Sequence, residues 1–243
     1  MQRQGVISDF DIRTASRLTV DAMVAKLGDI SGKRVIDLGA GYGGAARVLA
    51  KKHGAHVTCL NLSLKENARN RELTQAAGLS DKISVVDGSF DDIPFADAEF
   101  DVAWSQDAIL HAPDRLAVLR EVERVLKPGG QFVFTDPMQA DGLVDTHALQ
   151  PIYDRIHLAD LTSIGFYRKA LTDLGFAEVE TDELTRQLGN HYARVREVML
   201  EKQEEFGLPD AFVECMGDGL ELWIKGATTR QLSWAIMHYC KLG

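Results

Sequence analysis

A glycine-rich turn near the start of the chain brings together residue types that suit the binding of a nucleotide. The run Val-Ile-Asp-Leu-Gly-Ala-Gly (35–41) is a β-branched apolar strand that leads into this turn. Gly39 and Gly41 can adopt positive φ and leave no Cβ between the backbone and a ligand. A helix over 45–52 would direct its free N–H groups at the same ligand. The run therefore predicts a nucleotide-binding turn, with the acid Asp37 beside it.

Three interpretations of this turn compete. Gly39, Gly41 and Gly44 fit the G-x-G-x-x-G pattern of dinucleotide-binding proteins, and a strand-to-helix turn without a ligand also uses glycine. Asp37, however, would repel a pyrophosphate and would suit a cation, such as the amino group and sulfonium of S-adenosylmethionine (SAM). Dinucleotide sites also use an acid at the end of the second strand, whereas this chain has Asn61 there. These residues favour SAM.

Composition restricts the classes of partner. The 243 residues suffice for one large α/β domain, and 45% hydrophobic residues can fill its core. A net charge of −9 argues against nucleic acid or an anionic membrane as the main partner, and favours small neutral or cationic substrates. A polar start without a long apolar run predicts a cytoplasmic protein. Cys59, Cys215 and Cys240 are too few and too far apart for a metal site or a disulfide framework.

Strand-like and helix-like segments alternate from residue 32 onward, and this pattern predicts a parallel sheet covered on both faces. The predicted strands are 34–38, 56–60, 82–87, 100–105, 130–136, 176–181 and 232–239. The predicted helices are 44–53, 64–78, 114–126, 164–174, 188–206 and 210–226. The Lys-Pro-Gly-Gly run (127–130) is expected to end the third helix. The segment 139–163, rich in Asp, His and Gly, interrupts the alternation and predicts a lid over the cleft.

Four short motifs, taken in order, resemble the class I SAM-dependent methyltransferases. They are Val-Ile-Asp-Leu-Gly-Ala-Gly (35–41), Asp-Ile-Pro-Phe (92–95), Phe100-Asp101 and Leu-Lys-Pro-Gly-Gly (126–130). The resemblance implies one domain over residues 1–243, with a Rossmann-like seven-stranded mixed sheet, helices on both faces and a helical lid insertion after the fifth strand. It also implies that SAM lies across the carboxyl ends of the first strands and leaves as S-adenosylhomocysteine.

The same resemblance assigns residues to the parts of the cofactor. They are Asp37, Gly39 and Gly41 for the methionine moiety, Asn61 and Leu62 for the ribose, and Ser89 and Phe90 for the adenine; Gln106 follows the fourth strand and is a further candidate. Asn61 and Ser89 stand where many relatives have an acid, so both contacts lose charge assistance. We therefore expect apolar enclosure of the adenine by Leu62 and Phe90 to supply part of the affinity.

Further motifs resemble the sarcosine/dimethylglycine N-methyltransferases of betaine synthesis. They are Trp104–His111, Thr135–Met138, Asp154–Ile156, Gly165–Arg168, Asn190–Tyr192 and Leu232–Trp234. Such enzymes methylate the amine of an N-methylated glycine and produce glycine betaine. Asp136-Pro137-Met138 replaces an Arg-Asn-Tyr run of glycine-methylating relatives, and this difference argues against glycine as a substrate.

Methyl transfer from a sulfonium is an in-line displacement, so its rate depends mainly on alignment. A dimethylglycine site needs a cation for the carboxylate and an aromatic or thioether surface for the methylated nitrogen. The candidates for these contacts are Arg155 and Arg168 for the carboxylate and Pro137, Met138, Tyr167, His191, Tyr192 and Trp234 for the rest of the substrate. His111 and Asp136 are the catalytic candidates, although Asp136 could instead cap a loop.

Other functions stay open at this level. The fold also hosts methyltransferases for other small amines and for natural products with O, N or C acceptors. A SAM-binding protein without turnover and a dinucleotide-dependent oxidoreductase are the remaining alternatives. The predicted partner is a small-molecule amine, bound by substrate elements at about 139–163 and 188–226. Association into a homodimer also stays open.

Overall fold

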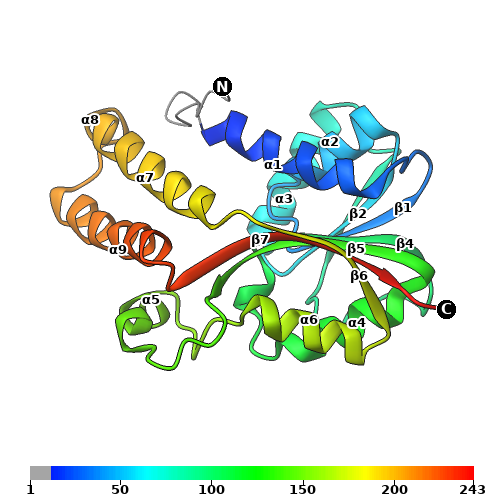
Figure 1. Cartoon of the computed structure of the whole chain (residues 1–243). Coiled ribbons are helices and arrows are strands. Elements are labelled where there is room, and N and C mark those ends of the chain that lie inside the picture. The colour runs from blue at the N-terminus through cyan, green and yellow to red at the C-terminus, as the bar shows by residue number, and fades with distance from the viewer. Residues whose placement is uncertain (1–11) are drawn as a thin grey trace, which may run out of the picture. The chain divides into compact units, whose positions relative to one another are not determined.

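The computed structural model describes residues 12–243, which build a seven-stranded sheet and its surrounding helices (Figure 1). The strands are β1 (Arg34–Leu38), β2 (His56–Asn61), β3 (Ile83–Asp87), β4 (Phe100–Gln106), β5 (Leu126–Gln139), β6 (Phe176–Glu183) and β7 (Leu232–Lys241). The helices are α1 (Ile12–Leu27), α2 (Gly44–His53), α3 (Leu64–Ala76), η2 (Ile109–His111), α4 (Arg115–Val125), η3 (His147–Leu149), α5 (Gln150–Arg155), α6 (Ile164–Asp173), α7 (Thr185–Glu201), α8 (Gln203–Phe206) and α9 (Asp210–Thr228). Within these residues, no helix has both the length and the apolar character needed to cross a bilayer.

The sheet is mixed, as the resemblance predicts. Its strand order is β3-β2-β1-β4-β5-β7-β6, and the pairs formed among β1 to β5 are parallel. On β7, His238 bonds to Gln131, whereas the earlier residue Ser233 bonds to Gln139 further along β5. β7 therefore runs opposite to β5. Parallel β1, β2 and β4 direct their carboxyl ends to one edge, where open α/β sheets bind ligands.

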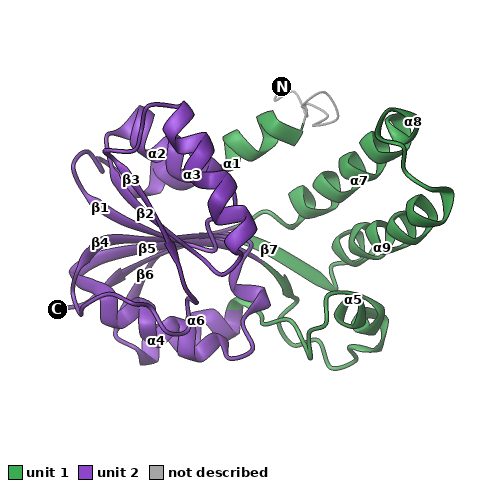
Figure 2. Cartoon of the chain, turned by 180° about the vertical axis from the view of Figure 1, so that it is seen from behind, with its two compact units in different colours: residues 1–19, 137–164, 183–235 green, residues 20–136, 165–182, 236–243 purple. Residues whose placement is uncertain are grey.

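The chain divides into two compact units (Figure 2). Unit 2 (residues 20–136, 165–182 and 236–243) contains β1 to β4, with α2 and α3 on one face of its sheet and α4 and α6 on the other. Unit 1 includes 137–164 and 183–235, and there α9 packs against both α7 and α5. Both segments predicted to bind substrate fall within unit 1.

Helix α1 is absent from the sequence prediction, which assigns no element before residue 32. Val20, Met23, Val24 and Leu27 are its buried residues. They follow one another at the i, i+3, i+4, i+7 spacing of an amphipathic helix. The signal was therefore present in the sequence, but it is short and lies among polar residues.

The prediction was also wrong about the start of β5. The Lys-Pro-Gly-Gly run does not separate helix from strand, because β5 begins at Leu126, directly after α4. Phe100 aligns with Leu126, but Val102 aligns with Gln131, so the strand contains an irregularity over this run. Lys127 Nζ lies 2.6 Å from Asp101 Oδ1 and holds the irregular segment against β4.

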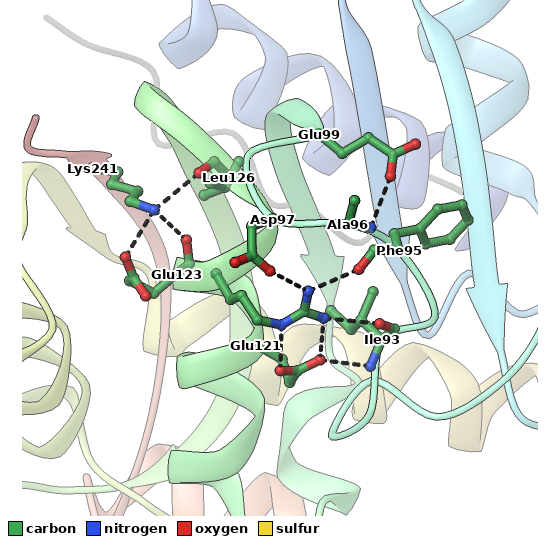
Figure 3. Close-up of polar contacts among 10 residues, drawn as sticks. Ile93, Phe95, Ala96, Asp97, Glu99, Glu121, Glu123, Leu126 and Lys241 are labelled. Atoms are coloured by element: carbon green, nitrogen blue, oxygen red, sulfur yellow. Dashed lines mark hydrogen bonds and ion pairs between the residues drawn. The ribbon is translucent and has the colours of Figure 1, made fainter.

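Arg124, in the last turn of α4, ties this helix to the loop before β4, and its partners Ile93, Phe95, Asp97 and Glu121 are labelled in Figure 3. Its guanidinium lies 2.7 Å from Glu121 Oε2 and 2.9 Å from Asp97 Oδ1, and donates to the carbonyls of Ile93 and Phe95. Hydrogen bonding to Arg124 holds the pKa of Glu121 below its usual range. One planar guanidinium thus satisfies two carboxylates and two carbonyls, a geometry that a lysine cannot reproduce.

We expect Arg124→Lys to lower the free energy of unfolding by about 1–3 kcal/mol, because several charge-assisted hydrogen bonds are lost. The matched control is Arg69→Lys, which alters a more exposed pair with Glu72. An exposed pair contributes little, so the control should change stability by less than about 1 kcal/mol. Chemical denaturation measures both changes. Equal effects of the two substitutions would contradict the structural role of Arg124.

Candidate functional site

The glycine turn after β1 is packed closely against its neighbours. Gly39 has a φ of 74°, and its N–H donates to Leu60 O at 2.9 Å. A Cβ at this position would lie 2.4 Å from the Cβ of Ala108, so only glycine fits. Gly41 also has a positive φ, of 51°, but a Cβ there would meet nothing within 4 Å. Gly39 is therefore required by packing, whereas Gly41 keeps the backbone open to a ligand.

Asp37 lies in β1 between β2 and β4, beside Cys59 and Trp104. Only 3% of this residue is exposed, and burial raises the pKa of its carboxyl to about 7. No residue within 12–243 donates a hydrogen bond to this carboxyl. A buried carboxylate needs a donor or a cation, because the loss of hydration is otherwise uncompensated. Asp37 therefore suits a positively charged ligand.

Asn61, at the end of β2, is held by residues of α3. Its Nδ2 donates to Glu66 Oε2 at 3.1 Å, and Asn67 Nδ2 donates to Asn61 O at 2.7 Å. Leu62, which follows, is 74% exposed. The sequence prediction missed Glu66, which brings a carboxylate to this strand end. The Ser-x-x-Glu spacing from Ser63, the N-cap of α3, is a signal that could have identified it.

The other predicted cofactor residues lie after β3 and β4. Ser89 forms an isolated bridge with Asp92. A Cβ built on Gly39 would lie 3.7 Å from Phe90 Cε1, so the Phe90 ring borders the glycine turn. Gln106 is the last residue of β4 and is partly buried. Phe90 is thus close to the turn that follows Asp37.

His111 and Asp136, the predicted catalytic residues, differ in their access to solvent. His111 is exposed at the end of η2. Partial burial of its ring and the positive charge of Arg115 both hold the pKa of His111 below its usual value. Asp136 is completely buried, and burial raises its pKa to about 8. A neutral imidazole that reaches solvent can accept a proton from a ligand, whereas a fully enclosed carboxyl cannot contact one.

Tyr167 and Arg168, predicted to contact the substrate, are engaged by protein groups. Tyr167 is completely buried, and its hydroxyl donates to Asp136 Oδ2 at 2.6 Å. Arg168 donates to Glu178 through two nitrogens, at 2.6 and 3.0 Å. Hydrogen bonding to Arg168 lowers the pKa of Glu178. Both side chains therefore already have strong partners in the folded chain.

Arg155 has uncharged hydrogen-bond partners in unit 1. Its guanidinium donates to Cys215 O at 3.0 Å and to the sulfur of Met216. A Cβ at Gly219 would lie 2.3 Å from Arg155 Nε, so this glycine allows the guanidinium to approach α9. Within the described part of the chain, no carboxylate forms an ion pair with Arg155. The guanidinium borders a hollow of about 440 Å³ that Glu214 and Asp218 also line.

Aromatic side chains of α7 and α9 stack on each other. The rings of Tyr192 and Trp223 lie 5.0 Å apart at 28°, and His191 meets Tyr192 edge-on at 5.3 Å. The sequence prediction missed Trp223, whose position on an amphipathic helix carries no distinguishing signal. Trp234 lies on β7 and is 7% exposed. Pro137 and Met138, predicted to face the substrate, are both buried.

Comparison with known proteins supports the resemblance seen in the sequence. A family model described as a methyltransferase domain matches residues 36–134. A glycine/sarcosine/dimethylglycine N-methyltransferase of Actinopolyspora halophila is 50% identical over 94% of this chain, which spans 40% of that relative's length. A sarcosine/dimethylglycine N-methyltransferase of Halorhodospira halochloris is 46% identical over 95% of this chain and 83% of the relative.

A solved structure is similar over nearly the whole chain. It is the crystal structure of a Galdieria sulphuraria protein proposed to be a sarcosine dimethylglycine methyltransferase, with a TM-score of 0.92 and 42% identity. The match covers 96% of this chain and 88% of that one.

The burial of Asp37 predicts a pH-dependent stability. Its folded-state pKa of about 7 lies above the ordinary value of 3.8, so the unfolded chain releases this proton at lower pH. The contribution of this carboxyl to stability is therefore lost as the pH rises from about 4 to about 7. Relative to wild type, Asp37→Asn should gain up to about 1.4 kcal/mol in unfolding free energy for each pH unit in this window.

Denaturation of the free protein at several pH values measures this difference. Other titrating groups cancel, because both proteins contain them. The matched control is Ile36→Val, a non-titrating change in the same buried strand, whose effect on stability should be independent of pH. A pH-independent difference for Asp37→Asn would contradict the raised pKa.

Proposed function

The chain belongs to the family of the sarcosine/dimethylglycine N-methyltransferases, and from this premise we propose that it transfers methyl groups from SAM to sarcosine and to dimethylglycine. The products would be dimethylglycine and glycine betaine. The observation that carries the proposal is the glycine turn with its buried Asp37, in a chain 46% identical to such an enzyme over 95% of its length.

The cofactor site fits SAM rather than a dinucleotide. Asp37 is a buried carboxyl without a cationic partner among the described residues, and the methionine moiety of SAM would provide one. Gly41 leaves the backbone open on the same turn. Asn61, with the adjacent Glu66, offers hydrogen-bonding groups for the ribose, and Phe90 offers an apolar surface for the adenine. When bound, SAM supplies a methyl group on a sulfonium, while these side chains hold and orient it.

Arg155 is the better candidate for the substrate carboxylate. Arg168 is neutralised by Glu178, which takes two of its hydrogen bonds. Arg155 keeps its charge without a paired carboxylate, so binding an anion there displaces no ion pair. Glu214 and Asp218 border the same hollow, which therefore presents both charge signs and suits a zwitterionic amino acid.

Tyr192, which is half-buried and stacks on the buried ring of Trp223, offers an aromatic surface for the methylated nitrogen. Aromatic faces attract quaternary ammonium groups through the ring quadrupole. His191 extends this surface at the edge of Tyr192. We therefore propose that Trp223 supports the ring of Tyr192 from within α9.

His111 is our candidate for proton removal. Its depressed pKa keeps the imidazole neutral at physiological pH, as a base requires. Each amine is protonated in its zwitterion and must lose that proton before its lone pair can attack the methyl group. Sarcosine, a secondary amine, loses a second proton after methylation, whereas dimethylglycine, a tertiary amine, has none left to lose. A base at His111 is therefore expected to matter more for the first methylation than for the second.

A methylation assay with labelled SAM tests the proposed function. We expect product from sarcosine and dimethylglycine, and little or none from glycine, phosphoethanolamine or simple phenols. The reason is that Pro137 and Met138 stand where glycine-methylating relatives have polar residues, and that Arg155 is our candidate for binding the substrate carboxylate. Efficient methylation of an acceptor without a carboxylate would overturn the substrate assignment. Calorimetric binding of NAD in preference to SAM would overturn the cofactor assignment.

Substitution of Arg155 tests the carboxylate contact. Arg155→Lys keeps the charge but loses the two-point fork, so the KM for dimethylglycine should rise at unchanged SAM affinity. Arg155→Ala should lower kcat/KM by about 10- to 100-fold, which corresponds to about 1.4–2.8 kcal/mol. Arg168→Ala is the matched control, because the guanidinium of Arg168 is already paired with Glu178 and is not expected to bind the substrate. A larger rise in KM for Arg168→Ala than for Arg155→Ala would reassign the carboxylate site.

A further inference from the structure

We propose that Asp136 and Tyr167 are positioning residues that fix the turn of residues 107–112, which we call the η2 turn and which carries His111. The inference rests on the proposed function, since it explains how a base at His111 would be held. It assigns Asp136 and Tyr167 roles other than the catalytic and substrate-binding roles predicted from the sequence. Both residues would act through the η2 turn.

The carboxyl of Asp136 accepts one hydrogen bond on each of its two oxygens, both from donors within the protein. Tyr167, from α6, donates its hydroxyl to Oδ2 at 2.6 Å. The backbone N–H of Leu110 donates to Oδ1 at 3.1 Å. Neither Asp136 nor Tyr167 has any exposed surface. A carboxyl whose two oxygens are both engaged in a closed environment cannot reach a substrate, but it can orient the donors that it binds.

Leu110 is held through both of its backbone groups. Its N–H bonds to Asp136, and its carbonyl accepts a hydrogen bond from Arg115 Nη2 at 3.0 Å. His111 N donates to Ala108 O at 3.1 Å and closes the turn. The backbone immediately before His111 is therefore fixed from two sides, and this restricts where the imidazole can lie.

The start of the η2 turn borders the glycine turn. Ala108 occupies the space that a side chain at position 39 would need, with its Cβ 2.4 Å from the Cβ that would be built on Gly39. A shift of the η2 turn would therefore also change the packing against the residue that follows β1. Asp136 thus contributes to the geometry of both His111 and the proposed cofactor turn.

A buried acid at position 136 destabilises the folded chain unless hydrogen bonds to both of its oxygens compensate for the lost hydration. Burial disfavours its ionised form, and Asp107 adds repulsion, while Tyr167, Leu110 and Arg115 offset part of this cost. A carboxylate accepts from both donors, whereas an alanine accepts from neither. An asparagine can still accept from Leu110 through its oxygen and donate to the Tyr167 hydroxyl. The two substitutions therefore separate positioning from proton transfer.

The test compares Tyr167→Phe, Asp136→Ala and Asp136→Asn in the full chain, at a temperature where each is folded. Hydrogen exchange of the peptide that contains Leu110 reports the turn directly. Exchange should accelerate at least about tenfold in Asp136→Ala, which removes the acceptor of the Leu110 amide, and less in Tyr167→Phe, which keeps that acceptor but frees its carboxyl to move. Asp136→Asn should retain wild-type exchange. Tyr153→Phe is the matched control, since it removes a hydroxyl bonded to Gln139 in unit 1.

Kinetics with sarcosine complete the test. We expect kcat to fall about tenfold or more in Asp136→Ala, with a smaller change in KM, and to be largely rescued in Asp136→Asn. Loss of activity in Asp136→Asn equal to that in Asp136→Ala, at unchanged exchange, would show proton transfer by Asp136 and overturn the proposal. Unchanged exchange in both Asp136→Ala and Tyr167→Phe would overturn it as well. If Asp136→Ala fails to fold, hydrogen exchange at Leu110 in Tyr167→Phe decides: unchanged exchange in that variant overturns the proposal.

The two proposals fail separately. A wild-type chain that methylates neither sarcosine nor dimethylglycine refutes the proposed function. Hydrogen exchange at Leu110 still decides whether Asp136 and Tyr167 fix the η2 turn, because that measurement needs no substrate.

Discussion

The contact between Gly39 and Ala108 is the constraint around which the proposed cofactor site is organised. β1 can turn sharply at its carboxyl end only because position 39 has no side chain and lies at a φ of 74°. The same turn bonds to Leu60 of β2 and adjoins the segment after β4. Three parallel strands therefore end at one point, and Asp37 is buried between the outer two. A larger residue at 39 would separate them.

Two buried aspartates illustrate how the surroundings of a residue decide its role. Asp37 and Asp136 are both almost or completely inaccessible, and burial raises the pKa of each. Asp136 has two donors, Tyr167 and Leu110, so its partners lie within the protein. Asp37 has no donor within residues 12–243 and thus suits a cation from outside. Burial alone would not distinguish a positioning residue from a binding residue; the donors do.

The arginines show the same dependence on partners. Arg124 and Arg168 each bind acidic side chains through several hydrogen bonds, so their charges stabilise the fold locally. Arg155 donates to a carbonyl and a thioether, which leave its charge uncompensated. In a chain with a net charge of −9, a cation of this kind is the natural place for an anionic ligand group.

The sequence by itself determined those features that depend on residues close together along the chain. The bounds of β1 (34–38) and α2 (44–53) were predicted correctly, because apolar periodicity and glycine act locally. The mixed sheet and the cofactor turn followed from ordered motifs. Tertiary structure alone decided the partners of individual side chains: Tyr167 bonds to Asp136, 31 residues away, and Arg155 reaches Cys215, 60 residues away. Residue spacing cannot encode such pairs, since they form only when separate elements pack together.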